Sequence, residues 1–385
     1  MGDNKINDVF QLGWLSYKES YYLSDEQFKA GNAIYKCKTP EMGCNTSVCE
    51  ECGYTEIHNN SCRNRHCPKC QAVNKAIWVD ERQSEVINSP YYHAIFTVPY
   101  ELNNLIYENQ KNLYALLHKC AAETIIELAR DKKYIGGVPG IIQVLHTWGS
   151  DLKYHPHIHS VISGGCLSPD KTKILMRGDR FFLPVHVVSK KFKGKFLFYL
   201  KSYREAGMLK YGCKCDSLRN SYEWKEFINR LYGKDWVFYI KETFNHFGNA
   251  IKYLGNYTHR VAISNQRIKS VDESGVVFTV KDYKTGEYNK EISLTLDEFL
   301  SRMMLHVLPG RFQKIRYYGF LNNRYKSANL KIIFKLQGRQ RSKARFKGLS
   351  KPEIIKLAFG KNLFICPCCG KETLKPAGRT FPRME

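Results

Sequence analysis

The hydrophobic and polar positions of this chain follow two periods, one typical of strands and one typical of helices. Residues 91–98 are rich in aromatic and β-branched side chains and stop at a proline, so they predict a β-strand. Residues 140–148 and 157–162 have the same character and are joined by a polar turn, which predicts two paired strands. Apolar positions at helical spacing predict a long helix over residues 101–130.

Later segments extend this alternation and predict an α+β fold, with an antiparallel sheet flanked by helices. They comprise three strands, at 235–240, 276–280 and 291–295, and a helix over 247–257.

Composition predicts three domains in the 385 residues. Residues 1–85 hold seven of the fourteen cysteines and form a small N-terminal domain. Residues 86–310 hold most of the strand pattern, with a basic insertion at about 168–232. Residues 311–385 form a basic, mainly helical C-terminal region, whose first part, 311–350, has twelve Lys or Arg and no Asp or Glu.

The net charge narrows the choice of partner. The chain has 60 Lys or Arg against 36 Asp or Glu, a net charge of +24. Such an excess favours a polyanion, most often nucleic acid, because each cation placed at a phosphate releases a counterion. We see no apolar run of membrane-spanning length and no secretory signal pattern, so we expect a cytoplasmic protein that does not associate with a membrane.

The cysteines are spaced like metal ligands. Cys49 and Cys52, and then Cys67 and Cys70, form two C-x-x-C pairs with fourteen residues between them. Two such pairs are typical of a tetrahedral zinc site, and without a signal peptide metal binding is favoured over disulfides. The alternative interpretation is four buried free thiols.

Other cysteines predict further zinc ligands. A second zinc site is predicted at Cys37, Cys44, Cys62 and His66, since Cys62 and His66 are one helical turn apart. The alternative is that Cys37 and Cys44 are ordinary buried residues. Cys366 and Cys369 form a third C-x-x-C pair without an obvious partner, for which Cys213 and Cys215 are weak candidates. We therefore expect one or two structural Zn²⁺ ions.

Cations lie among the predicted zinc ligands. Arg63, Arg65 and Lys69 are placed between or beside them, where a rigid metal knuckle could present them to DNA. Solvated surface charge is the alternative interpretation.

A histidine strand predicts a second kind of metal site. His157 and His159 are two residues apart in a predicted strand, so they project from the same face, while Ile158 points to the core. If the turn before them is a hairpin, His146 arrives beside the pair as a third ligand; His155 and His93 are rivals. Imidazoles suit Mn²⁺, and Mg²⁺ would need phosphate and water to complete its shell. Hydrogen-bonded core histidines are the alternative.

Two tyrosines four residues apart, Tyr253 and Tyr257, share a face if their segment is helical. A phenolate can attack phosphorus, provided that a metal, cation or base lowers its high pKa. His259, Arg260 and Arg267 are close in sequence and could serve as DNA contacts. Taken alone, such an aromatic pair usually reflects packing.

These motifs occur in an order that resembles a known family, the two-tyrosine HUH transposases of rolling-circle insertion sequences with an N-terminal zinc-binding domain. Four stretches carry the resemblance, namely residues 60–70, residues 146–149 with 155–159, residues 253–265 and residues 306–309. The family often has a histidine just before the first knuckle; here Asn45 occupies that place, and the neighbouring Cys44 could substitute for it.

The resemblance implies an enzyme that nicks and rejoins single-stranded DNA. It implies that His157 and His159 hold a catalytic Mg²⁺ or Mn²⁺, that Tyr253 and Tyr257 are paired nucleophiles, and that a 5′-phosphotyrosine intermediate forms. The third metal ligand is not fixed by the family motif, so His146 rests on the hairpin argument alone. The implied partners are single-stranded or hairpin transposon ends, target DNA and a host helicase.

The basic region then fits a DNA-binding tail, in which cations such as Arg316 and Arg324 follow the backbone and aromatic residues stack on unpaired bases. Two alternatives stay open from the sequence. One is a plasmid or phage-type replication initiator or relaxase with the same chemistry. The other is a non-catalytic zinc DNA-binding protein.

Overall fold

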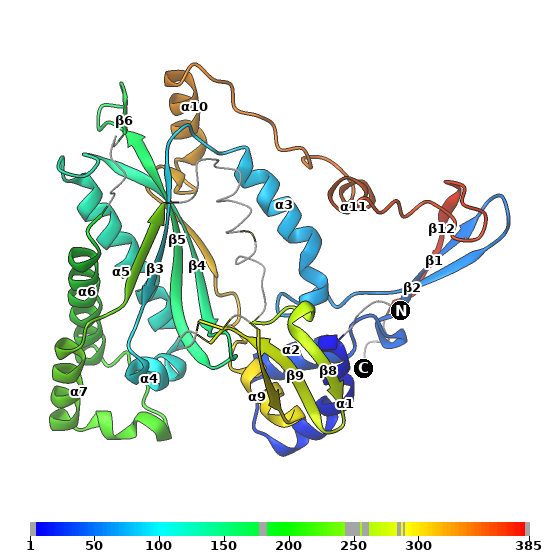
Figure 1. The fold of residues 1–385 in the computed structure, drawn as a ribbon, viewed down its shortest axis with the longest axis horizontal. Coiled ribbons are helices and arrows are strands. Elements are labelled where there is room, and N and C mark those ends of the chain that lie inside the picture. Colours follow the sequence, from blue (N-terminus) through cyan, green and yellow to red (C-terminus); the bar gives the residue numbers. More distant parts are fainter. Residues whose placement is uncertain are drawn as a thin grey trace.

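A computed structural model describes residues 5–176, 183–242, 255, 262–282, 286–287 and 289–381. It confirms the expected α+β fold with antiparallel sheets. Figure 1 shows a central sheet with helices on both faces, a smaller α/β unit beside it and a narrow β-ribbon that projects at one end. In the part of the chain described, no helix is long and apolar enough to cross a membrane.

The central sheet has six strands in the order β11-β4-β5-β3-β7, with β6 paired to β5, and every pairing is antiparallel. The predicted strand pair is confirmed as the long hairpin of β4 and β5, and the strand predicted over 91–98 is confirmed as β3. The strand predicted over 235–240 begins three residues later, as β7. The bounds are β3 Tyr91–Thr97, β4 Val138–Trp148, β5 Tyr154–Leu167, β6 Ile174–Met176, β7 Phe238–Glu242 and β11 Ile315–Tyr318.

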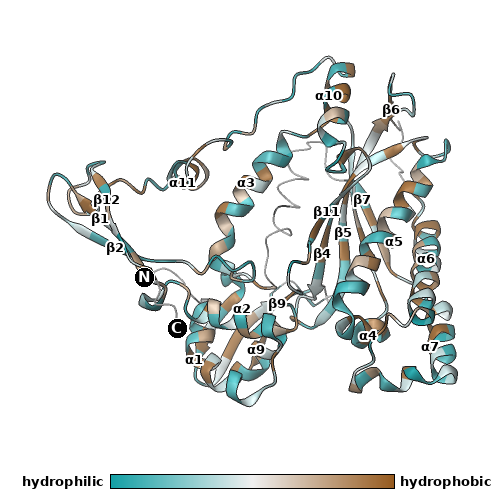
Figure 2. Ribbon diagram, turned by 180° about the vertical axis from the view of Figure 1, so that it is seen from behind, coloured by the Kyte–Doolittle hydropathy of each residue, from teal (hydrophilic) through white to brown (hydrophobic). Residues whose placement is uncertain are grey.

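Helices α4 to α7 cover one face of this sheet and enclose the largest hydrophobic core (Figure 1). Ile158 and Ile162 of β5 point into this core, as their alternation with the histidines predicted. Figure 2 shows hydrophobic and hydrophilic residues alternating along α5 and α6, as expected for helices with one buried face. Their bounds are α4 Asn103–Glu108, α5 Gln110–Arg130, α6 Val185–Glu205 and α7 Ser221–Gly233, with 3₁₀ turns η3 Tyr100–Leu102 and η4 Cys213–Arg219.

The helix predicted over 101–130 is not continuous. It is broken at Asn109, which has non-helical backbone angles and separates α4 from α5. The Asn109 amide donates to the carbonyls of Leu105 (2.9 Å) and Lys210 (2.8 Å), so it satisfies the backbone at the break and ties it to a distant loop. Asparagine competes with helical hydrogen bonding in this way, which the apolar period cannot reveal.

The other face of the sheet is covered at one end by α3 (Ala72–Gln83) and α10 (Lys326–Leu336). Their apolar side chains pack on Ile142 and Val144 of β4 and Val161 of β5. The histidines lie on this same face, because they alternate with the residues directed to the opposite core.

A smaller unit is formed by the N-terminal helices and residues 262–308, which pack together. Helices α1 (Lys5–Ser20) and α2 (Asp25–Tyr35) pack with a three-stranded sheet and α9 around a common core. Gly31 faces the ring of Trp14, where a Cβ would lie 2.0 Å from a ring carbon, so only glycine fits. The other bounds are η5 Asn265–Arg267, β8 Ile268–Asp272, β9 Gly275–Val280, β10 Lys290–Leu294 and α9 Leu296–Met304; β9 and β10 confirm two predicted strands.

The β-ribbon joins the two ends of the chain. Strand β12 (Leu374–Arg379) pairs with β1 (Cys44–Cys49), which pairs with β2 (Thr55–Asn59). The chain reaches β12 through α11 (Lys351–Phe359), which packs against α3. The basic region thus contains helices, as predicted, but also two strands, one in each of two sheets. Short 3₁₀ turns complete the structure, namely η1 Pro40–Met42, η2 Pro68–Gln71 and η6 Gly319–Leu321.

Candidate active site

Three histidines converge where the β4–β5 hairpin approaches its turn. The register pairs His146 of β4 with His157 of β5, and Val144 with His159. One ring nitrogen from each of His146, His157 and His159 lies within 4.8 Å of the others. The structure therefore brings His146 to the pair, as the hairpin argument predicted.

The two histidines of β5, His157 and His159, both direct Nε2 toward the space between the three rings. The Nδ1–H of His157 donates to the carbonyl of His155 (2.7 Å), and Nδ1 of His159 is hydrogen-bonded to Nε2 of His93 (2.9 Å). Their Nε2 atoms are 3.1 Å apart. An ion about 2.1 Å from two nitrogens at a right angle separates them by about 3.0 Å, so the pair has the spacing of adjacent metal ligands.

Burial keeps these imidazoles in the form that binds a metal. It lowers the pKa of His157 to about 3 and that of His159 well below its ordinary value, and nearby histidines add to both shifts. Neutral imidazole offers a lone pair at neutral pH. Neither rival for the third position belongs to the cluster: the His155 carbonyl accepts from His157, and His93 lies behind His159 as a hydrogen-bond partner.

A layer of side chains, Trp148 of β4 with His306 and Lys314, supports His146. Trp148 stacks on the His146 ring with centroids 4.4 Å apart, and the Lys314 ammonium lies 4.8 Å from the Trp148 ring. His306 donates to the carbonyl of Leu152 (2.9 Å) and bonds the Thr147 hydroxyl (3.1 Å). This layer holds the hairpin turn in place.

The sequence interpretation missed Lys314, because it treated residues 311–350 as a uniform DNA-binding tail. Desolvation of its ammonium group lowers the pKa of Lys314 to about 7, and the nearby Arg65 adds to the shift. Its position directly before the edge strand β11 was the one available signal.

The first cysteine cluster consists of Cys37, Cys62, Cys67 and Cys70. Three of its sulfur–sulfur distances are 3.6 Å: Cys37 to Cys70, Cys62 to Cys70 and Cys67 to Cys37. Tetrahedral zinc with Zn–S bonds of about 2.3 Å separates its sulfurs by about 3.8 Å. The cluster fits one zinc ion, with Cys37 and Cys67 buried in the core of the smaller unit.

This grouping corrects the predicted one. Cys49 and Cys52 do not join Cys67 and Cys70; they lie with Cys366 and Cys369 in a second cluster. The reason is the pairing of β1 with β12, which brings the last knuckle of the chain beside the first. Cys213 and Cys215, the weak candidates for partners of Cys366, are in neither cluster.

Two other predicted zinc ligands are placed elsewhere. Cys44 contacts the Thr380 hydroxyl (3.4 Å), and His66 accepts a hydrogen bond from the Leu308 amide (3.4 Å). Burial lowers the pKa of His66 to about 3, so it is a neutral acceptor. Neither belongs to a cysteine cluster.

Some of the predicted DNA contacts have partners within the protein. Arg65 donates to the carbonyls of Phe312 (2.7 Å), Pro309 (2.7 Å) and Leu308 (3.3 Å), so it joins the zinc knuckle to the layer behind His146. Arg267 donates to the carbonyls of Thr279 (2.8 Å) and Ser150. Both guanidinium groups therefore connect segments that are distant in the sequence by hydrogen bonds to backbone carbonyls.

The other predicted contacts that the structure describes differ in exposure. Arg63 and Arg324 are exposed, and Lys69 and Arg316 are half-buried. Arg316 and Arg324 each lie over an aromatic ring, those of Phe312 and Tyr325.

The tyrosine pair lies outside the described residues, as do His259, Arg260 and nearly all of the helix predicted over 247–257. One residue between the tyrosines is described. Gly255 lies against α3, where an added Cβ would be 2.3 Å from a methyl group of Val79.

Comparison with known proteins defines the class to which this fold and these clusters belong. Residues 9–98 match a family model described as "Transposase zinc-binding domain", which spans the first cysteine cluster. Residues 140–329 match a model described as "Putative transposase", which spans the three histidines and the tyrosine pair. The class is thus the transposases with an N-terminal zinc-binding domain.

Two relatives identify the family within this class. The chain is 38% identical over 327 residues to "Putative transposase y4qJ" of Sinorhizobium fredii. The aligned residues are 85% of this chain and 82% of the relative. It is 25% identical over 317 residues to "Transposase for insertion sequence element IS801" of Pseudomonas savastanoi pv. phaseolicola. Here the aligned residues are 81% of this chain and 74% of the relative. The chain belongs to this family, the IS91-type transposases. No solved structure matches it.

Proposed function

We propose that this transposase nicks and rejoins single-stranded DNA at transposon ends, by rolling-circle transposition. The observation that carries the proposal is the convergence of ring nitrogens from His146, His157 and His159 on one face of the central sheet. Membership of a transposase family makes cleavage and transfer of DNA strands the chemistry to be explained.

The histidines would hold a divalent ion. The neutral imidazoles of His157 and His159, whose Nε2 atoms are 3.1 Å apart, suit such an ion, and one or more open positions would remain for substrate. Bound Mg²⁺ or Mn²⁺ would polarise the scissile phosphate and stabilise its developing charge. The hydrogen bond from His157 to the His155 carbonyl and the bond between His159 and His93 keep both rings oriented for this task.

Tyr253 and Tyr257 would supply the nucleophiles. A phenolate oxygen attacks phosphorus, the bond from phosphorus to the 3′ oxygen breaks, and that oxygen leaves as a free 3′-OH after taking a proton. The 5′ phosphate stays on the tyrosine. Attack by a 3′-OH on this phosphotyrosine reverses the step and restores the phenol, so rejoining needs no external energy.

Two tyrosines allow two strands to be handled in turn. One can hold the first 5′ end while the other cleaves the second strand. Displacing a strand during such transposition would require a host helicase. Exposed cations of residues 311–350, among them Arg324, Arg339 and Lys343, would contact the DNA backbone.

The test is formation of a covalent protein–DNA adduct that survives denaturation. Wild-type protein is incubated with Mn²⁺ and single-stranded hairpin oligonucleotides from the transposon ends, and adducts are counted on denaturing gels. Tyr253→Phe and Tyr257→Phe should each retain part of the adduct, and the double variant should form none. Tyr22→Phe, at a tyrosine that is 99% exposed, is the matched control and should behave as wild type.

Persistence of the adduct in the double variant would refute the nucleophile assignment. Absence of any adduct with wild-type protein on all end sequences would favour a DNA-binding protein without cleavage activity.

A further inference from the structure

Half of the second cysteine cluster lies outside the stretch that matches the zinc-binding domain, because that stretch contains Cys49 and Cys52 but not Cys366 and Cys369. Cys49 and Cys52 come from the β1–β2 hairpin, and Cys366 and Cys369 come from a knuckle near the other end of the chain. Their four sulfurs lie within 4.8 Å of one another, with Cys49 to Cys369 and Cys52 to Cys366 both 3.7 Å apart. This spacing is close to the roughly 3.8 Å edge of a tetrahedral zinc–sulfur site.

The two knuckles have the same backbone hydrogen bonds. The Cys49 amide donates to the carbonyl of Tyr54 (2.9 Å), and the Cys366 amide donates to that of Lys371 (2.8 Å), each five residues later. The glycine that follows each C-x-x-C pair donates back to the carbonyl of the first cysteine, Gly53 at 3.0 Å and Gly370 at 2.9 Å.

Both glycines have left-handed backbone angles, φ 71° and φ 73°, which side chains disfavour. The knuckle at Cys67 and Cys70 is followed by Gln71 and a helix instead. The two C-x-x-C-G knuckles are therefore built as a matched pair.

Side chains around the sulfurs support the same pairing. The Thr373 hydroxyl lies 3.1 Å from the Cys49 sulfur. Acidic residues of the first knuckle pair with lysines beside the second, Glu51 with Lys371 (3.0 Å) and Glu50 with Lys375 (2.7 Å).

The ribbon has little else to hold it together. Among the described residues, its hydrophobic cluster consists of Cys49, Cys366 and Leu374, and most positions of β2 and β12 are exposed. A sheet of three short strands with so small a core needs a staple, such as a metal ion. The sulfurs of two of these three buried residues belong to the cluster itself.

We propose that Cys49, Cys52, Cys366 and Cys369 bind a second zinc ion, which ties the C-terminal end of the chain to the N-terminal hairpin. The inference is independent of the proposed strand cleavage. It gives the C-terminal strap, residues 337–365, an attachment at each end.

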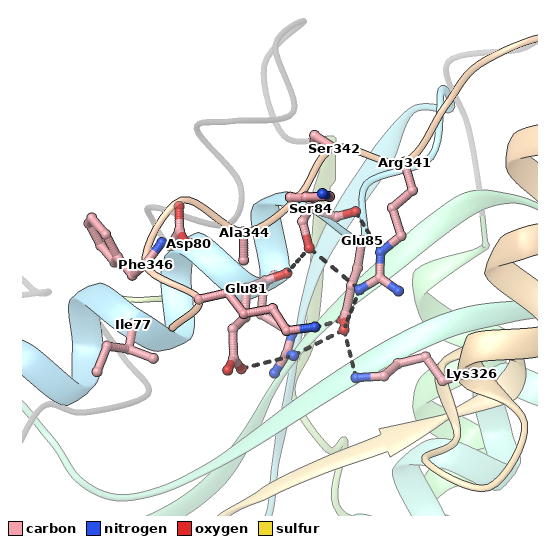
Figure 3. Close-up of a pocket in the computed structure, with 13 residues that line it drawn as sticks. Ile77, Asp80, Glu81, Ser84, Glu85, Lys326, Arg341, Ser342, Ala344 and Phe346 are labelled. Atoms are coloured by element: carbon pink, nitrogen blue, oxygen red, sulfur yellow. Dashed lines mark hydrogen bonds and ion pairs between the residues drawn. The ribbon is translucent and has the colours of Figure 1, made fainter. Parts of the chain in front are cut away.

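The first attachment of the strap is to α3, shown in Figure 3. The Phe346 amide donates to Asp80 (2.9 Å), and Arg341 donates to the carbonyl of Ser84 (3.1 Å). The zinc ion forms the second attachment. Lys343 and Lys347 are exposed at the first attachment, α11 packs on α3 beyond it, and the zinc ion would hold the far end of the strap beside the N-terminal hairpin.

Metal analysis of the purified full chain tests the proposal. Wild type should contain two zinc ions per chain, and the variant with Cys366→Ser and Cys369→Ser should contain one. Cys368→Ser is the matched control, because Cys368 lies in the same knuckle but outside the cluster; it should keep two ions. Trypsin should cut the strap faster in the double variant than in either wild type or the control.

Two results would overturn the proposal. One is a single zinc ion in wild type that the double variant retains. The other is a wild-type mass that lacks the thiol hydrogens, which would make these four cysteines disulfides. If the double variant does not fold, cobalt replacement in wild type decides the question, since two thiolate-bound ions are expected and one would contradict the proposal.

Discussion

The histidine site and the cysteine clusters are built in opposite ways. The histidines sit on long strands of a six-stranded sheet, and the backbone register alone brings His146 opposite His157. The cysteines of the second cluster sit in short turns of a ribbon whose buried core is three residues. The first cluster is intermediate, with turns packed against the core of the smaller unit.

This difference separates two uses of a metal. A site fixed by a sheet is preorganised, so its ion is available for chemistry and can be exchanged without loss of fold. A site fixed by turns obtains its order from the ion, so binding free energy becomes folding free energy. The histidine site should thus tolerate metal removal, and the cysteine clusters should not.

The largest effect should come from breaking the first cysteine cluster. Cys67→Ser removes a ligand that is fully buried, and we expect it to lower the free energy of unfolding by about 4 kcal/mol or more, because zinc is lost with the thiolate. Chemical denaturation and metal analysis check this. Cys44→Ser, at a cysteine outside both clusters, is the control. If the Cys67→Ser and Cys44→Ser variants were equally stable, the first cysteine cluster would not depend on its ion for folding, and its contrast with the histidine site would be wrong.

The next effect concerns the polar network that holds the strap to α3 (Figure 3). Glu85 is buried and pairs with Arg82 (2.8 Å) and Lys326 (2.7 Å), with Arg341 at 3.5 Å. Glu85→Ala leaves these cations without their shared partner and should cost about 3–5 kcal/mol of unfolding free energy. Glu81→Ala removes an exposed partner of the same Arg82 and should cost less than about 1 kcal/mol. A loss below about 1 kcal/mol in Glu85→Ala would contradict the role of Glu85 as the shared partner of these cations.

A smaller effect probes the preorganisation of the histidine site. His93→Phe removes the hydrogen bond to Nδ1 of His159 while keeping a ring in place. We expect Mn²⁺ affinity to fall by about 10–100-fold, as for other partners of metal ligands, with little change in thermal stability. His93→Asn, which keeps an acceptor, should restore part of the affinity. Unchanged Mn²⁺ binding in His93→Phe would assign His93 a packing role only.

The smallest effect is a pH dependence carried by His306. Burial lowers its pKa to about 4, whereas an unfolded histidine titrates near 6.5. Between these values the unfolded state binds a proton that the folded state does not, so stability falls as the pH falls. Going from pH 7 to pH 5 should cost about 2 kcal/mol through this group. In His306→Gln the loss of unfolding free energy over this interval should shrink by that amount; an unchanged slope would show that His306 does not contribute.

How much the sequence predicts depends on whether the pattern is local. Strand alternation and a short polar turn are local, so the hairpin and the meeting of His146 with His157 could be predicted. The grouping of cysteines could not be predicted from the nearest spacing, because β1 pairs with β12 at the far end of the chain. The glycine after each of the two matched knuckles was the local signal that could have revealed it.

Charge was harder to interpret than hydrophobicity. The basic excess indicated a polyanionic partner, but it did not show which cations face DNA. Arg65 and Arg267 hold backbone carbonyls, and Lys314 lies beside Trp148 behind the histidines. A cation's partners depend on tertiary contacts, which a composition count cannot contain.

Manganese binding to zinc-loaded protein tests the central claim most directly. Wild type, measured by electron paramagnetic resonance, should bind one Mn²⁺ per chain at the three histidines. The variant with His157→Ala and His159→Ala should bind none there, while its zinc content and its fold by circular dichroism stay as in wild type. Mn²⁺ binding that is unchanged in this variant would contradict the account.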